Sequence, residues 1–275
     1  SRFSIRLKQQ SSQRPILEKF PNHPIQAVSR GRKFPINILD YLAYGTQKYE
    51  RGGNVFIRQY IPPGQSVKLI LNISDNGIKD EVIKSFYFLS VFGGLGAKSR
   101  NGFGGFSLTD PEVFKNYGLP HFPDKDFMDG INKNCEMPSY TAFSKKMKIF
   151  KLKSSPEESW NKCLAEIGKI YRESKSNLER KHQYKKRQYI GSPISEGKYP
   201  RSFLERRSKP HFLRVIETSD GFDGYIIYLP SAYCEGLKKD RNDNPINHDQ
   251  VNRAFYESCN KFNSYLNHRM EVVYG

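Results

Sequence analysis

The residues best suited to chemistry form one glycine-rich stretch, FGGLGAKSRNGFGG, at residues 92–105. Six glycines surround a short cationic segment that holds Lys98 and Arg100. Glycine adopts positive φ angles and lets other groups approach the backbone closely. Backbone amides presented in this way bind anions, and the two cations add charge. The stretch is therefore predicted to bind a polyanion. Its predicted contact residues are Gly93, Gly94, Gly96, Lys98, Ser99, Arg100, Gly102 and Gly104.

The two familiar nucleotide-binding loops do not fit this stretch. The dinucleotide fingerprint G-x-G-x-x-G needs a glycine where Ser99 stands, and the Walker phosphate loop needs one where Ala97 stands. Both loops also run from a strand into a helix. Here a helical apolar pattern begins near Asn76 and precedes the loop, and a strand pattern at Phe103–Leu108 follows it. The reversed order favours a polynucleotide backbone over a mononucleotide.

The charge of the chain points to the same class of partner. Its 275 residues include 45 Lys and Arg against 28 Asp and Glu, a formal net charge of +17. Such a balance favours a nucleic acid, although solvated lysines alone would give the same composition. The four cysteines are scattered, which indicates a reducing, cytoplasmic location without a disulfide or zinc site. We expect no metal or other cofactor, and no apolar run is long enough to cross a membrane.

Three further groups of side chains could contact RNA. The first is the basic face of an alternating N-terminal strand, and the second is an aromatic and cationic strand face on which bases could stack. The third is a basic run after a helix. An ordinary packed strand face is the alternative for the second, and a solvated helix end is the alternative for the third. These groups are Arg2, Arg6 and Lys8; Phe56, Arg58 and Tyr60; and Lys185, Lys186 and Arg187.

The residues from about 146 onward read as β-α-β-β-α-β, a ferredoxin-like order. The strands are predicted at Lys146–Lys153, Phe212–Glu217, Tyr225–Leu229 and Met270–Tyr274. The two helices are predicted to begin at Ser155 and Asn247, where capping residues precede amphipathic patterns.

The part before about 110 ends in a similar order. Residues 9–33 read as a long surface loop, and a short helix is predicted at Ile36–Tyr44. Strands at Val55–Ile61 and Val67–Ile73 are predicted to form a hairpin across a Pro-Pro-Gly turn. The predicted class is α+β, with two ferredoxin-like (RRM-like) domains. Residues 1–110 form a first, partial domain with its glycine-rich loop at 93–105, residues 111–144 an irregular connector, and residues 145–275 the second domain.

The loop pattern, G-G-x-G, five residues, then G-x-G-G, resembles the signature loop of the RAMP superfamily of CRISPR effector proteins. Within that superfamily, residues 92–105 are most similar to subunit one of the type III-B Cmr complex. The stretches SRFSI at 1–5, LAYG at 42–45, RRSKP at 206–210 and IIYLPS at 226–231 also agree with this resemblance. Lys209 departs from it, because it interrupts the usual Ser-Pro pair.

The resemblance implies a non-catalytic RNA-binding subunit of a type III CRISPR interference complex. Guide RNA, target RNA and sister RAMP subunits are the implied partners, with no membrane. The guide would be contacted near its 3′ end, together with the guide–target duplex. The family's opening strand and helix do not appear in this sequence, so a separate N-terminal piece could complete the first domain.

Two other functions stay open. A RAMP-type, metal-independent endoribonuclease that processes guide precursor RNA needs a general base, for which His23 and Asp110 are candidates. An exposed histidine and an ordinary Asp-Pro turn are the simpler interpretations of these residues, so we expect no enzyme. The third function is that of a general RNA-binding protein outside CRISPR, but the chain lacks the RNP1 signature of RNA-recognition motifs.

Overall fold

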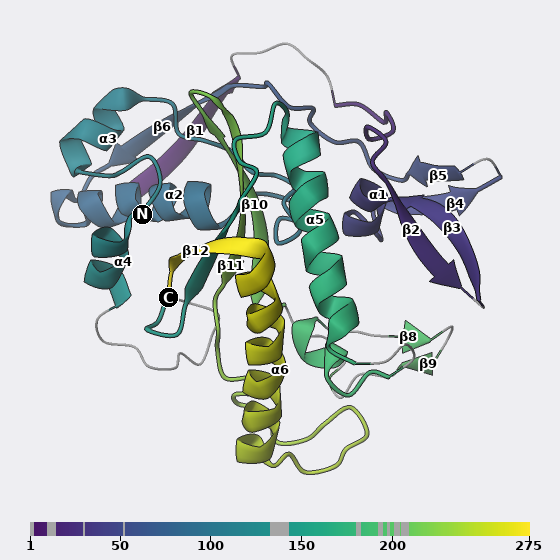
Figure 1. The fold of residues 1–275 in the computed structure, drawn as a ribbon. Helices are drawn as coiled ribbons and strands as arrows, with labels where there is room; N and C mark the ends of the chain where they lie inside the picture. The colour runs from purple at the N-terminus through teal and green to yellow at the C-terminus, as the bar shows by residue number, and fades with distance from the viewer. Residues whose placement is uncertain are drawn as a thin grey trace. The chain divides into compact units, whose positions relative to one another are not determined.

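The computed structural model describes residues 3–9, 15–29, 31–51, 53–132, 143–179, 183–191, 195–196, 199–200, 204 and 209–275. Arg2 is the one candidate RNA-binding residue outside these ranges. The chain divides into two compact units (Figure 1). The first consists of Ser1–Val91 and Leu108–His121, and the second of Phe92–Ser107 and Phe122–Gly275. The glycine-rich segment, placed in the first domain by the sequence analysis, thus groups with the second unit.

The second unit has the predicted β-α-β-β-α-β order. Its sheet has the strand order β10-β11-β7-β12, and every neighbouring pair is antiparallel. This order places the hairpin beside the first strand, as in ferredoxin-like folds. The elements are β7 (Lys148–Leu152), α5 (Trp160–Asn177), β10 (His211–Thr218), β11 (Gly221–Tyr228), α6 (His248–Arg269) and β12 (Met270–Tyr274). A short η2 helix (Arg187–Ile190) and the pair β8 (Ser195–Glu196) and β9 (Tyr199–Pro200) lie between α5 and β10.

The core of the second unit lies between the sheet and its two helices. The apolar stripes expected from the 3.6-residue period are buried in both helices. Gly224 on β11 makes room for α5, because a Cβ there would lie 2.8 Å from both Cys163 Sγ and Ile167 Cγ2. The buried stripe residues are Cys163, Leu164, Ile167, Ile170 and Tyr171 on α5, and Phe255, Cys259, Phe262 and Leu266 on α6.

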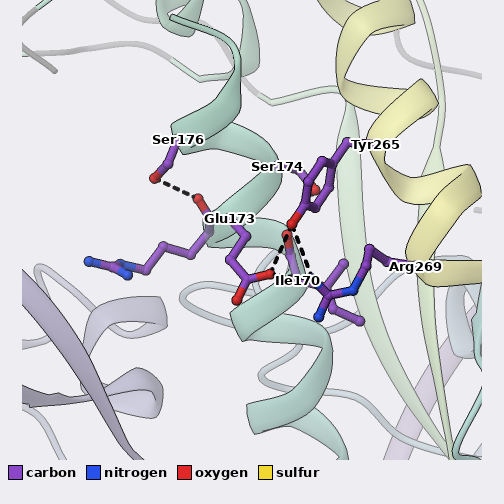
Figure 2. A network of polar contacts seen from close by, with 7 residues as sticks. Ile170, Glu173, Ser174, Ser176, Tyr265 and Arg269 are labelled. Carbon is purple, nitrogen blue, oxygen red and sulfur yellow. Dashed lines mark hydrogen bonds and ion pairs between the residues drawn. The ribbon is translucent and has the colours of Figure 1, made fainter. Parts of the chain in front are cut away.

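Helices α5 and α6 are also joined by polar contacts (Figure 2). The Glu173 carboxylate on α5 accepts a hydrogen bond from Tyr265 Oη at 3.0 Å and one from Arg269 Nη1 at 2.9 Å. Arg269 also donates to Tyr265 Oη at 3.1 Å. Since Tyr265 and Arg269 are both on α6, Glu173 holds the two helices in register at the surface of the unit.

The first unit contains small antiparallel sheets. Strand β1 (Phe3–Gln9) pairs with β6 (Val67–Ile73), so that Phe3 faces Ile73 and Leu7 faces Leu69. Two hairpins lie between β1 and β6 in the sequence. The first pairs β2 (Pro24–Ser29) with β3 (Arg32–Asn37), and the second pairs β4 (Gln47–Glu50) with β5 (Gly53–Phe56). The helical elements are α1 (Ile38–Leu42), η1 (Asn76–Ile78) and α3 (Pro111–Tyr117), and α2 (Lys79–Phe92) runs to the start of the glycine-rich segment.

Two predictions for the first unit are wrong. The predicted hairpin of Val55–Ile61 with Val67–Ile73 does not form, because β5 pairs with β4 and β6 pairs with β1. Prolines 62 and 63 cannot donate to a ladder, which separates the two segments. The predicted loop at 9–33 contains β2 and the start of β3, with a turn at Gly31, whose φ is +79°.

Three predictions around the second unit also need correction. Phe103–Leu108 is not a strand, and backbone pairing occurs at Asn101 instead, as an isolated parallel bridge to Leu213. The predicted connector contains the helices α3 and α4 (Lys125–Asn132). Helix α5 begins at Trp160 rather than at Ser155, because the backbone of Glu157 first pairs with Phe222 of β11. Among the described helices, none is long and apolar enough to cross a membrane.

Candidate nucleic-acid interface

The glycine-rich segment folds back on itself. The Leu95 N–H donates to the Gly104 carbonyl at 2.8 Å, which closes the base of the loop. Within the loop, the Asn101 N–H donates to the Lys98 carbonyl at 2.7 Å. Lys98 has a φ of +64°, a left-handed conformation that non-glycine residues rarely adopt. The turn at Lys98 is therefore fixed by its surroundings, and the exposed tip is Leu95, Gly96 and Ala97.

Contacts at Arg100 hold this loop against the start of β10 in the same unit. The Arg100 carbonyl accepts the Leu213 N–H at 3.1 Å. Its guanidinium donates from Nη1 to the Lys209 carbonyl at 2.9 Å and lies 4.5 Å from the centre of the Phe212 ring. Arg100, predicted as a phosphate ligand, thus also docks the loop on the start of β10. An arginine is suited to both tasks, because its planar group stacks and donates at the same time.

Close contacts within the chain account for much of the glycine content. A Cβ at Gly104 would lie 1.8 Å from the Leu95 carbonyl oxygen. A Cβ at Gly102 would lie 2.4 Å from Leu164 Cδ1 of α5, and one at Gly105 would lie 2.6 Å from Arg214 Nη1. A Cβ at Gly94 would also make close contacts, whereas a Cβ at Gly96 would meet nothing within 4 Å. The sequence analysis assigned glycine density to a bound polyanion, and the structure shows packing as a second reason.

Lys209 lies beside this loop, and the charges of three other cations act on it. Lys209 Nζ is buried, has no hydrogen-bond partner among the described residues, and lies 4.3 Å from the centre of the Tyr171 ring. Burial places the pKa of Lys209 well below the ordinary lysine value, and the charges of Lys175, Arg100 and Lys98 lower this pKa further. The four cations come from three segments of the second unit.

Lys175 extends the group along α5. It lies one helical turn after Tyr171, so the two side chains share a face. Burial lowers the pKa of Lys175 from 10.5 to about 8, and the neighbouring Arg187 charge adds to this shift. The sequence analysis missed Lys175, and it treated Lys209 only as a departure from a motif. A lysine on an otherwise apolar helical stripe was the available signal for Lys175.

The aromatic residues of the strand face predicted to stack on bases, Phe56 and Tyr60, are packed inside the first unit. Phe56 is 8% exposed, and its ring centre lies 4.8 Å from that of Phe20 and 5.2 Å from that of Tyr60. Strand β5 ends at Phe56, so Arg58 and Tyr60 do not continue a common strand face. The alternative of an ordinary packed cluster fits Phe56 and Tyr60, while Arg58 is exposed.

The other predicted cations are divided between the two units. Arg6 and Lys8 are exposed on β1 of the first unit, and Lys185 and Lys186 are exposed before η2 of the second unit. Arg187 instead binds the end of α5: its Nη2 donates to the carbonyls of Glu179 at 2.8 Å and Ser176 at 3.4 Å. Arginine is favourable there because carbonyl groups at a helix C-terminus carry partial negative charge.

The candidate bases Asp110 and His23 have structural partners, and so does a third polar residue, His211. Asp110 is the N-cap of α3 and accepts the Glu112 N–H at 3.1 Å. The His23 backbone N–H donates to Asn37 Oδ1 at 3.1 Å. His211 is buried, hydrogen-bonded to Asn263, and its pKa is lowered by burial to about 3, so this ring is neutral. The part of the chain that the structure describes contains no group of three or more His, Cys, Asp or Glu that could hold a metal.

Comparisons with known proteins support the resemblance seen in the sequence. Residues 12–107 match the family model of the RAMP superfamily. A search of curated proteins returned no match. The structure is similar to the crystal structure of Cmr1 from Pyrococcus furiosus in its apo form, with a TM-score of 0.52 and 19% sequence identity. That similarity covers 100% of this chain and 78% of Cmr1, and it confirms the α+β, ferredoxin-like fold class. The resemblance is thereby confirmed: residues 12–107 match the RAMP superfamily, and the fold of the chain is similar to that of Cmr1.

Proposed function

We propose that this protein is an RNA-binding, non-catalytic subunit of a type III CRISPR interference complex. The observation that carries the proposal is the closed glycine-rich loop, which holds Lys98 and Arg100 beside Lys209 and Lys175 on the second unit. The RAMP match over residues 12–107 and the Cmr1-like fold support the assignment to a CRISPR effector. Guide RNA, target RNA and sister RAMP subunits are the proposed partners, and the guide is contacted near its 3′ end and along the guide–target duplex.

The chemistry of the loop suits a phosphate backbone. Lysine and arginine that contact phosphates fix the position of a strand without reading its bases. Lys98 is the better reporter of RNA contact, because Arg100 also docks the loop through Lys209 and Phe212. Arg6, Lys8, Lys185 and Lys186 are exposed and could add phosphate contacts, each in its own unit.

The non-catalytic part of the proposal rests on the roles found for Asp110 and His211. Asp110 is committed to a helix cap and His211 is neutral and buried. A general base must reach the proton that it removes, which the buried His211 ring does not do, while the exposed Asp110 carboxylate is engaged as a helix cap. A RAMP-type ribonuclease remains the alternative function, with His23 as its candidate base.

RNA binding tests the proposal directly. We expect the purified protein to bind oligouridylate and a mixed-sequence RNA with similar affinity, and Lys98→Ala to weaken both equally. The salt slope should fall by about 0.7 for one lost phosphate contact on a single strand. Lys238→Ala, which removes an exposed lysine from the loop before α6, is the control for the loss of charge. Failure of the unmodified protein to bind either RNA would refute the RNA-binding role.

Isolation of the native assembly tests the partners. The tagged protein should co-purify with other RAMP subunits and with CRISPR guide RNA, and crosslinks from the protein should map near the guide 3′ end. Recovery of cellular RNAs without guide sequences would instead support a general RNA-binding protein. Cleavage of guide precursor by the purified chain alone would support the ribonuclease.

A further inference from the structure

Lys209 has an unusual environment for a lysine. Its Nζ is buried, and within the described residues it has no hydrogen-bond partner. Among the described residues, Nζ lies over the face of the Tyr171 ring, 4.3 Å from the ring centre. A cation–π contact contributes only part of what a buried ammonium loses by leaving water. The free protein therefore holds a donor that lacks a counter-ion.

The neighbouring charges do not supply that counter-ion. Lys175, Arg100 and Lys98 all act on Lys209 as like charges. Like charges brought together at a buried position disfavour each other's ionised form. A folded protein gains nothing for its own stability from this arrangement, so a group outside the chain is the natural partner.

The carboxylates along α5 have other partners. Glu166 forms an ion pair with Lys169 at 2.7 Å. Glu173 points to α6, where it binds Tyr265 and Arg269 (Figure 2). Glu179, just after the helix, accepts the backbone N–H groups of Lys186 and Arg187. Among the described residues these carboxylates are therefore engaged elsewhere, and an anion supplied by a ligand could neutralise Lys209.

We propose that Lys209, Lys175, Lys98 and Arg100 form a binding site for one phosphate of an RNA backbone. The inference rests on the proposed RNA-binding function and deepens it, because it identifies residues beyond the glycine-rich loop. A phosphodiester carries its charge on two non-bridging oxygens, which accept hydrogen bonds from several cationic donors at once. The Tyr171 ring faces Lys209 Nζ, and the Arg100 contacts to Lys209 and Phe212 dock the loop that carries Lys98.

The site should couple RNA binding to proton uptake. In the free protein, burial and like charges lower the pKa values of Lys209 and Lys175, the latter to about 8. A bound phosphate favours the charged ammonium forms and raises both pKa values, so the complex takes up protons from the solvent. Arg187 is the further charged group that acts on Lys175. Affinity for RNA is therefore expected to decrease as pH rises through about 8.

The test compares Lys209→Met, Lys175→Met and the unmodified protein. Oligouridylate affinity is measured as a function of salt and of pH from about 7 to 9, and inorganic phosphate is measured separately by its effect on the melting temperature. We expect each methionine variant to bind RNA roughly tenfold more weakly and with a salt slope smaller by about 0.7. The double variant should lose the pH dependence. Lys238→Met is the control, and it should keep both the slope and the pH dependence.

The outcomes separate this inference from the proposed function. If the unmodified protein binds RNA and both methionine variants keep its affinity, salt slope and pH dependence, the inference is wrong and the RNA-binding function stands. If inorganic phosphate stabilises the unmodified protein but not Lys209→Met while RNA affinity is unchanged, the site binds free phosphate and the RNA-backbone assignment is overturned. If the unmodified protein binds no RNA, the proposed function itself fails. Circular dichroism checks that each variant is folded. Should Lys209→Met not fold, the RNA affinity, salt slope and pH dependence of folded Lys175→Met decide the test.

Discussion

Leu95 and Gly104 close the base of the glycine-rich segment on each other. The Leu95 N–H donates to the Gly104 carbonyl at 2.8 Å, and a Cβ at Gly104 would lie 1.8 Å from the Leu95 carbonyl oxygen. No real Cβ tolerates such a distance from backbone, so a glycine is required here for the fold of the loop itself. Gly96, four residues earlier than Arg100, has open space around its Cβ position.

Gly104→Ala is therefore expected to destabilise the protein much more than Gly96→Ala. Both residues have positive φ angles, +65° and +82°, so both variants include the left-handed strain of about 1 kcal/mol. Only Gly104→Ala adds a backbone clash, and its cost should reach about 3 kcal/mol or more. Urea unfolding of the two variants measures the difference. Equal decreases in unfolding free energy for the two variants would show that the loop can open at its base without a cost in stability.

Gly224 gives a second steric prediction, in the core of the second unit. A Cβ there would lie 2.8 Å from Cys163 Sγ and from Ile167 Cγ2, and its φ is not in the left-handed region. We expect Gly224→Ala to lower the free energy of unfolding by about 1–3 kcal/mol, because α5 must shift away from the sheet. Gly130 of α4 is the matched control: its Cβ position is open, and Gly130→Ala should raise helix stability by about 0.5–1 kcal/mol.

The contrast between the two units shows what the sequence could predict. In the second unit, each element carries its own signal: the α5 and α6 stripes have the helical period, and Asn247 caps α6 by accepting the Gln250 N–H. Its hairpin turns tightly after Thr218, so neighbours in sequence are neighbours in the sheet. Local patterns of this kind determine the order of elements.

In the first unit the decisive pairing is not local. Strand β1 pairs with β6, and the two hairpins and α1 lie between them in the sequence. Alternation shows that each segment is a strand but says nothing about its partner. The prediction of the candidate site had the same limit. Lys98 and Arg100 were identified from the sequence because they lie in one segment, whereas Lys209 and Lys175 come near them only when the chain folds.

The contact of Glu173 with Tyr265 predicts a pH effect at the surface of the second unit. Burial, then the hydrogen bond to Glu173, raises the pKa of the Tyr265 phenol above 10.0. Its protonated form is therefore favoured in the folded state, so this contribution to stability is present below pH 10 and is lost as pH rises through the folded-state pKa. Tyr265→Phe should cost about 0.5–1 kcal/mol at neutral pH and should remove this part of the alkaline loss. Unfolding curves of both proteins at neutral and alkaline pH test this, and an unchanged alkaline loss in the variant would contradict it.

Lys175 predicts the opposite dependence on pH. Its pKa falls from 10.5 to about 8 on folding, so the unfolded chain binds more protons between these values. The stability of the unmodified protein relative to Lys175→Met should therefore increase as pH rises from about 8 to 10.5. Below about pH 8 the free energy of unfolding of Lys175→Met should exceed that of the unmodified protein by the largest amount, because the folded unmodified protein must then hold a charged lysine at a buried site. A difference in unfolding free energy that stays constant over this range would show that Lys175 is solvated in the folded state.

Asp110 and His23 decide between a structural and a catalytic role for the candidate bases. Asp110 accepts the Glu112 N–H at the start of α3, so Asp110→Ala should lower stability by about 1 kcal/mol without changing RNA affinity or any cleavage. Asp110→Asn and Asp110→Ser keep a capping acceptor and should restore the stability. His23→Ala should leave target cleavage by the assembled complex intact, because the backbone N–H of His23, which the substitution keeps, donates to Asn37 Oδ1. Cleavage is measured in purified complexes with equal RNA occupancy. Loss of cleavage in His23→Ala at full RNA occupancy would overturn the non-catalytic assignment and favour the ribonuclease.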